Sequence, residues 1–119
     1  MAAARAFSVA DLIAAQAQRE HDMAAFAHAL DRLDAIVLPS TPVTAIPLDK
    51  VDEAVTPALH TRFVNHLALA ALSLPIDVAP SGLPTSLQIV VRRFDDALAL
   101  RIGQAFEQAR GAFPLPPPA

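Results

Sequence analysis

Eleven prolines divide this chain of 119 residues and limit where regular secondary structure can run. Proline lacks a backbone N–H and clashes with the preceding helical turn, so it is excluded from helix interiors and from the middle of a sheet. Residues 8–33 contain no proline, whereas four prolines interrupt residues 39–57. This spacing predicts a long first helix, a short strand that ends at Pro39, and a loop over residues 40–56.

The first helix has a start signal and one apolar face. Ser8 and Asp11 form an S-x-x-D capping pattern, and helix-forming residues continue to about Leu33. Residues 34–39 then form a continuous apolar run, which is typical of a buried central strand in an α/β sheet. The helix stripe repeats at three- and four-residue steps and consists of Met23, Phe26, Ala27, Leu30 and Leu33.

The middle of the chain predicts a second helix and two more strands. The helix is expected from Pro57 or Ala58 to Ala70, with proline in the first turn. A strand over residues 72–78 tolerates Pro75 only at an edge or a bend. After a turn at residues 80–82, the strand over residues 85–91 places its side chains alternately on two faces. One face carries Leu87, Ile89 and Val91, and the other carries Ser86, Gln88 and Val90.

The last helix is the clearest element. Asp95 can cap it, Gly111 lies at the expected end, and the apolar stripe consists of Leu98, Ile102, Ala105, Phe106 and Ala109. Gly103 costs about 1 kcal/mol relative to alanine, which is tolerable if the helix packs closely against a sheet there. We interpret residues 1–113 as one domain and residues 114–119 as a proline-rich tail, with a P-x-x-P spacing that a frayed terminus explains better than an SH3 ligand.

Composition excludes several classes of function. The chain has no cysteine, which excludes disulfides and thiolate chemistry, and its formal charge of −3 argues against nucleic acid as a partner. The longest apolar stretch, residues 67–74, is too short to span a bilayer, and the N-terminus lacks a signal-peptide core. A cytoplasmic location is therefore expected, with no membrane partner.

Neither the serines nor the histidines form a recognisable catalytic or metal-binding set. Ser40, at a strand end, could pair with Lys50 as a Ser–Lys dyad, but a turn-stabilising serine and a solvated lysine explain both residues more simply. Surface or packing roles are favoured for His21, His28, His60 and His66, because none shows the spacing of a metal site. Arg92 and Arg93 are expected to be solvated or paired with Asp95 or Asp96. We assign no catalytic residue, no metal ligand and no cofactor.

Asn65 and Gln88 are the stronger candidates for a specific role. Both lie among apolar residues, and a buried amide must find hydrogen-bond partners. Each could simply hold a neighbouring loop through backbone groups, with those near residues 71–75 as the expected partners of Gln88. Alternatively, both could brace an active-site wall built by another segment.

Four segments, in this order, resemble the C-terminal part of amidase-signature enzymes. They are the run Asp34-Ala35-Ile36-Val37-Leu38-Pro39-Ser40-Thr41-Pro42 after a helix, the T-x-x-x-N helix from Thr61, the G-L-P-x-x-x-Q-I-V strand from Gly82, and the helix with Arg101-Ile102-Gly103. The resemblance implies an α/β fold with a partial mixed sheet of about three strands and packed helices, the C-terminal portion of the amidase-signature fold. Where the family usually has glycine, this chain has Ala68, Asp77, Ser86 and Val91.

The resemblance also implies what this chain lacks. The family hydrolyses C–N amide bonds with a Ser–cis-Ser–Lys triad and a Gly- and Ser-rich oxyanion loop, but this chain has one lysine and three dispersed glycines. Three interpretations stay open: an inactive C-terminal fragment, a subunit that completes an amidase or transamidase site with an N-terminal half, and a non-catalytic interaction module. An uncovered sheet would favour binding of that half or self-association.

Overall fold

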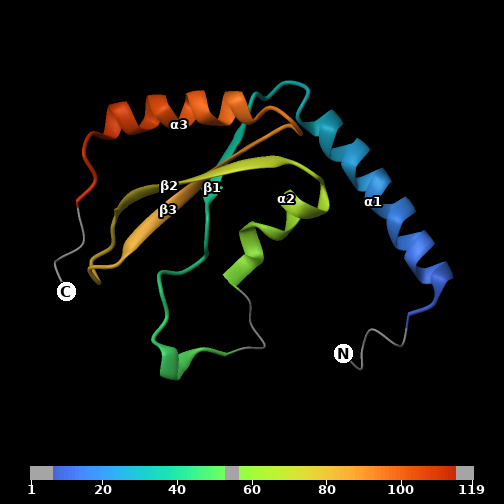
Figure 1. The fold of residues 1–119 in the computed structure, drawn as a ribbon, viewed down its shortest axis with the longest axis horizontal. Coiled ribbons are helices and arrows are strands. Elements are labelled where there is room, and N and C mark those ends of the chain that lie inside the picture. The colour runs from blue at the N-terminus through green and yellow to red at the C-terminus, as the bar shows by residue number, and fades with distance from the viewer. Residues whose placement is uncertain (1–6, 53–56, 115–119) are drawn as a thin grey trace.

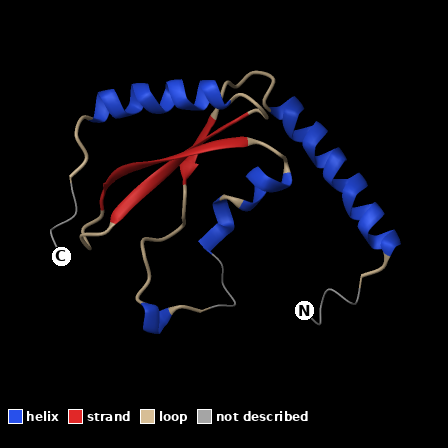
Figure 2. Ribbon diagram, viewed as in Figure 1, coloured by secondary structure: helices blue, strands red, loops and turns tan. Residues whose placement is uncertain are grey.

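A computed structural model describes residues 7–52 and 57–114 of the chain. The elements follow in the order α1 (Val9–Ala29), β1 (Ile36–Pro39), η2 (Leu48–Lys50), η3 (Pro57–His60), α2 (Arg62–His66), β2 (Ala70–Val78), β3 (Pro84–Val91) and α3 (Asp96–Arg110), where η denotes a short 3₁₀-helix. Figures 1 and 2 show α3 lying along the sheet while α1 runs outward from it. The predicted α/β class is confirmed.

The sheet has the order β1-β3-β2, and both pairings are antiparallel. The expectation of a mixed sheet is therefore wrong for the described strands. So is the central position expected for residues 34–39, because β1 is an edge strand and Val37 is 58% exposed. A continuous apolar run reports a preference for burial, but it does not reveal whether the same chain supplies the neighbouring strand.

The core lies between α3 and one face of the sheet. Leu87, Ile89 and Val91 point to this side, as their alternation predicted, and they pack with Leu74 and Ala99. Gly103 also matches its prediction, because a methyl group there would come within 2.5 Å of Leu72 Cδ2. From the predicted helix stripe, the residues packed against the core are Leu98, Ile102 and Phe106.

The helix ends follow their signals only in part. The capping box of Ser8 and Asp11 is present at the start of α1, but that helix ends at Ala29 rather than near Leu33. Asp95 occupies the N-cap of α3 without a side-chain capping bond, and Gly111 ends the helix with a φ of 80°. The proline-rich tail predicted from residue 114 falls outside the described residues beyond Pro114.

The helix expected up to Ala70 is shorter and broken. After η3, α2 ends at His66, where Leu69 N donates to the Val64 carbonyl and Ala68 N donates to the Asn65 carbonyl. These two bonds form a Schellman motif, which requires a left-handed residue just after the helix. Ala68 is that residue, with a φ of 54°, so one of the four departures from the family glycines falls at a position that needs positive φ.

Both edge strands carry a proline whose carbonyl is already bonded. His60 Nδ1 donates to the Pro39 carbonyl at 3.1 Å, and Arg110 donates to the Pro75 carbonyl. Strand β2 also has a register irregularity between Pro75 and Asp77, which confirms that Pro75 lies at an edge and a bend. Proline has no backbone N–H to donate, and each of these carbonyls already accepts a hydrogen bond from a side chain. These two positions therefore do not pair with a further strand.

We predict that Ala68→Gly stabilises the chain. Left-handed backbone costs a non-glycine residue about 1–2 kcal/mol, and the greater freedom of glycine in the unfolded chain offsets part of that relief. Denaturant melts should show a gain in unfolding free energy of up to about 1 kcal/mol. The control Ala70→Gly, at a strand position without positive φ, should lose about 0.5–1 kcal/mol. Equal losses in the two variants would contradict the assignment of strain to Ala68.

Candidate functional site

Polar side chains gather on the face of the sheet opposite α3. Ser40, which follows β1, is 8% exposed, and its Oγ lies 2.7 Å from Ser73 Oγ of β2. The Ser40 amide donates to the Ser86 carbonyl at 3.0 Å, so the serine continues the pairing of β1 with β3. Ser40 therefore fastens the end of β1 to both other strands.

Gln88 lies in the middle of this face. The side chain is 3% exposed, which confirms the predicted burial, and Nε2 donates to the His60 carbonyl of η3. The expected partner, backbone near residues 71–75, is wrong, because β2 pairs with β3 along that stretch and η3 supplies the bonding carbonyl. A contact between residues 28 apart is not encoded in local pattern.

Asn65 differs from its prediction. The residue is exposed on α2, whereas its apolar neighbours had indicated burial. Helix α2 has only five residues, and the buried one among them is Val64. Asn65 and Gln88 nevertheless line the same hollow between α2 and the sheet.

The structure does not bring Ser40 to Lys50. Ser40 bonds Ser73, while Lys50 is exposed in η2. Two serine hydroxyls bonded to each other offer no base that could take a proton from a nucleophile. The simpler interpretation of Ser40, a residue that satisfies local polar groups, fits this geometry.

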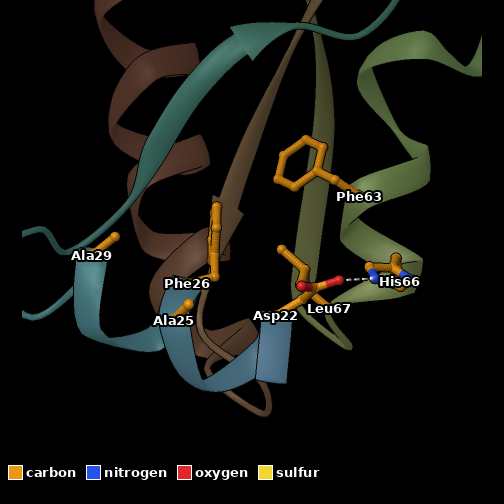
Figure 3. A pocket seen from close by; sticks show the side chains of 7 residues that line it. All are labelled: Asp22, Ala25, Phe26, Ala29, Phe63, His66 and Leu67. Atoms are coloured by element: carbon orange, nitrogen blue, oxygen red, sulfur yellow. Dashed lines mark hydrogen bonds and ion pairs between the residues drawn. The ribbon is translucent and has the colours of Figure 1, made fainter. Parts of the chain in front are cut away.

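A second hollow, of about 440 Å³, separates α1 from α2 (Figure 3). Its walls carry Phe26 and Phe63, whose ring centroids lie 5.9 Å apart. At one side His66 Nε2 lies 2.9 Å from Asp22 Oδ2, the contact drawn as a dashed line in Figure 3. Arg19 Nε donates to the His66 carbonyl at 2.6 Å, so two polar contacts join α1 to α2.

The pair of Asp22 and His66 was not predicted from the sequence. The residues are 44 positions apart and lie on different helices. Hydrogen bonds from His66 first, and then from Gln18, lower the pKa of the Asp22 carboxyl below its ordinary 3.8. The pair thus favours the ionised carboxylate and links the two helices.

His28, Arg92 and Arg93 make local or structural contacts. His28 lies 3.2 Å from Asp31 on the surface, and His21 is exposed. Arg92 donates to the Leu30 carbonyl instead of pairing with Asp95 or Asp96, and the Arg93 guanidinium lies 4.5 Å from the centroid of the Phe94 ring. Within residues 7–52 and 57–114, no three histidine, aspartate or glutamate residues converge as a metal site.

Comparisons with known proteins agree on one class. The family model described as Amidase matches residues 1–100. A Rhodococcus erythropolis protein described only as an uncharacterised protein in the nthA 5′ region is 40% identical over an alignment of 106 positions that covers 78% of this chain and 50% of that protein. A glutamyl-tRNA(Gln) amidotransferase subunit of an Exiguobacterium strain is 38% identical over 95 residues, covering 76% of this chain and 20% of that subunit.

A solved structure gives the same result. The crystal structure of an amidase superposes with a TM-score of 0.81 at 27% identity, covering 92% of this chain and 27% of that chain. The fold of this chain is thus that of a part of an amidase-type α/β protein. The chain belongs to the amidase family, and it spans about half the length of the Rhodococcus protein and about a fifth of the amidotransferase subunit.

We predict that the bond from Gln88 to the His60 carbonyl stabilises the chain. Gln88→Leu keeps the volume but leaves a carbonyl unsatisfied, which should cost about 1–3 kcal/mol in denaturant melts. Gln88→Glu should cost more near neutral pH, because it buries a charge. The control Gln104→Leu, at an exposed position of α3, should change stability by less than about 0.5 kcal/mol. An unchanged midpoint for both Gln88 variants would contradict the bond.

We also predict an acid-dependent role for Asp22. Its folded pKa is depressed, so its stabilising contribution is present above 3.8 and is lost as the pH falls through the lower folded value. Asp22→Asn should therefore lower the thermal midpoint at neutral pH, and this difference from the wild type should shrink as the pH falls below 3.8. Asp31→Asn is the matched control, because its partner His28 lies on the same surface segment. A difference between Asp22→Asn and the wild type that is independent of pH would contradict the assignment.

Proposed function

We propose that this chain is the C-terminal part of an amidase-family hydrolase and that it is inactive alone. In this proposal it completes the domain around a segment that carries the nucleophile and its lysine. The family match over residues 1–100 is the observation that carries the proposal. The sequence supports the proposed inactivity, because the chain has one lysine and only three glycines, at positions 82, 103 and 111.

The site geometry supports the same proposal. Ser40 is bonded to Ser73 and not to a base, so no described residue set supplies a nucleophile, a base and oxyanion donors together. The exposed edge residue Val37 and the exposed apolar side chains Phe7, Val9, Leu12 and Ile13 at the start of α1 offer surface to a further part of the domain. The N-terminal half of an amidase is the partner proposed for this surface.

A transamidase is the second candidate. The relative from Exiguobacterium is named as a subunit of a glutamyl-tRNA(Gln) amidotransferase, and its identity of 38% exceeds the 27% of the solved amidase. In that case the completed site would take the amide of glutamine.

A cytoplasmic location and the absence of nucleic-acid contacts in this chain stay predictions. No helix within residues 7–52 and 57–114 is long and apolar enough to cross a membrane.

We predict that the purified chain hydrolyses neither simple amides nor glutamine. The chain should be assayed alone and after mixing with the solved amidase from which the matching segment has been deleted. Activity is expected only in the mixture, because the truncated enzyme supplies the nucleophile and lysine. Ser40→Ala and Lys50→Ala are the control variants, and neither should lower the activity of the mixture by more than about twofold. Turnover by the chain alone that disappears in Ser40→Ala would contradict the proposal and establish the Ser40–Lys50 dyad.

A further inference from the structure

One backbone bond fixes the direction in which every residue of the sheet points its N–H and C=O groups. In an antiparallel pair, opposed residues either exchange both backbone bonds or exchange none, and the two kinds of pair alternate. The Ser40 amide donates to the Ser86 carbonyl, so Ser86 and every second residue after it point these groups toward β1. The residues between them, beginning with Leu87, therefore point theirs toward β2.

This alternation leaves two residues of β2 with open backbone groups. Leu72 lies opposite Ile89 and exchanges backbone bonds with it. Its neighbours Ala71 and Ser73 therefore point their N–H and C=O groups to the outer edge of the sheet, and both residues are exposed. The described residues outside the sheet form no backbone hydrogen bond with either of them.

The prolines of the two edge strands give an independent check. Pro39 and Pro75 both fall on positions that the alternation assigns to an outer edge, where the missing N–H of proline costs no bond. Their carbonyls accept from His60 and Arg110, which lie outside the sheet. The open segment of β2, residues 71–73, thus ends on one side at Pro75. On the other side it ends at Leu69, whose amide is already bonded in the Schellman motif.

This open segment is complementary to itself. A two-fold axis through Leu72 places Ala71 of one copy opposite Ser73 of the other, and the reverse. Each of these pairs can exchange both of its backbone bonds, because all four partners point outward. The pairing ends in the same way on both sides, since Pro75 would meet Leu69 of the other copy and neither has a free N–H.

The apolar surface beside the same edge is also uncovered. A hollow of about 120 Å³ lies where α3 meets the edge, and Leu100 on its rim is 60% exposed. A strand added to β2 would lie about 4.8 Å away and carry its own α3 on the same face of the sheet. Helices in contact have axes about 8–10 Å apart, so the two α3 helices could meet and cover Leu100. The lining of the hollow consists of Ala71, Leu72, Asp96, Ala99 and Leu100.

We propose that two copies of this chain pair through residues 71–73 of β2 and form one continuous sheet, with three strands from each copy. An unrelated extended segment would match only the backbone groups, whereas a second copy also brings the helix that covers Leu100. The proposal does not rest on the proposed function, because the edge at Val37 and the start of α1 stay free for the N-terminal half of an amidase.

The test combines sedimentation with amide hydrogen exchange, measured by NMR on the full 119-residue chain labelled with ¹⁵N. Between about 20 μM and about 1 mM the mass should approach that of a dimer, and exchange of the Ala71 and Ser73 amides should slow at least about fivefold. The Val37 amide is the internal control, because it points to the opposite edge and its exchange should not change. Protection of Ala71 and Ser73 in a monomer would assign the edge to another segment of the chain and overturn the proposal.

Variants separate pairing at this edge from general effects. Ala71→Pro removes an outward N–H and no bond to β3, so the chain should stay folded and monomeric. Ala71→Ser keeps that N–H and should dimerise like the wild type. Leu100→Glu, at an exposed position that tolerates charge in the monomer, should raise the concentration at half-dimerisation at least about tenfold. The proposal is overturned if the wild type stays monomeric at about 1 mM, if Val37 gains the protection instead, or if Leu100→Glu associates like the wild type.

Discussion

Strand β3 is the element on which the described structure depends. It pairs with β1 along one side and with β2 along the other, and Ile89, Val90 and Val91 are almost completely buried. The side chains of β3 alternate between the two faces of the sheet. Leu87, Ile89 and Val91 face α3, while Gln88 faces η3 and α2. The hydrophobic effect holds α3 in place, whereas one buried amide holds the irregular segment on the opposite face.

The long helix α1 is attached in a different way. It runs outward from the sheet, and none of its residues is fully buried (Figure 1). Leu30 just beyond it is buried, and the Leu30 carbonyl accepts from Arg92 at the end of β3. Further along, Asp22 and Arg19 bond His66 of α2. Polar contacts between partly exposed groups are weaker than core packing, so α1 is held less firmly than α3.

The chemistry of the polar face follows from the same arrangement. Ser40 and Ser73 meet because β1 and β2 flank the central strand, and their mutual bond leaves neither hydroxyl with a base. The hollow lined by Gln88 and Asn65 carries no formal charge. The chain therefore has a sheet of the amidase family, and no described residue on its polar face pairs a serine hydroxyl with a base.

Local sequence determined much of the architecture. Proline spacing, the capping box at Ser8 and the alternation of residues 85–91 predicted the start of α1 and the strands β1 and β3, and four ordered motifs predicted the family. Sequence did not determine that β1 is an edge strand, that Ala68 closes a Schellman motif, or that Gln88 bonds His60. Periodicity and capping describe one segment at a time. Strand order and the pairing of Asp22 with His66 depend on which distant segments the turns bring together, and only the tertiary structure decides that.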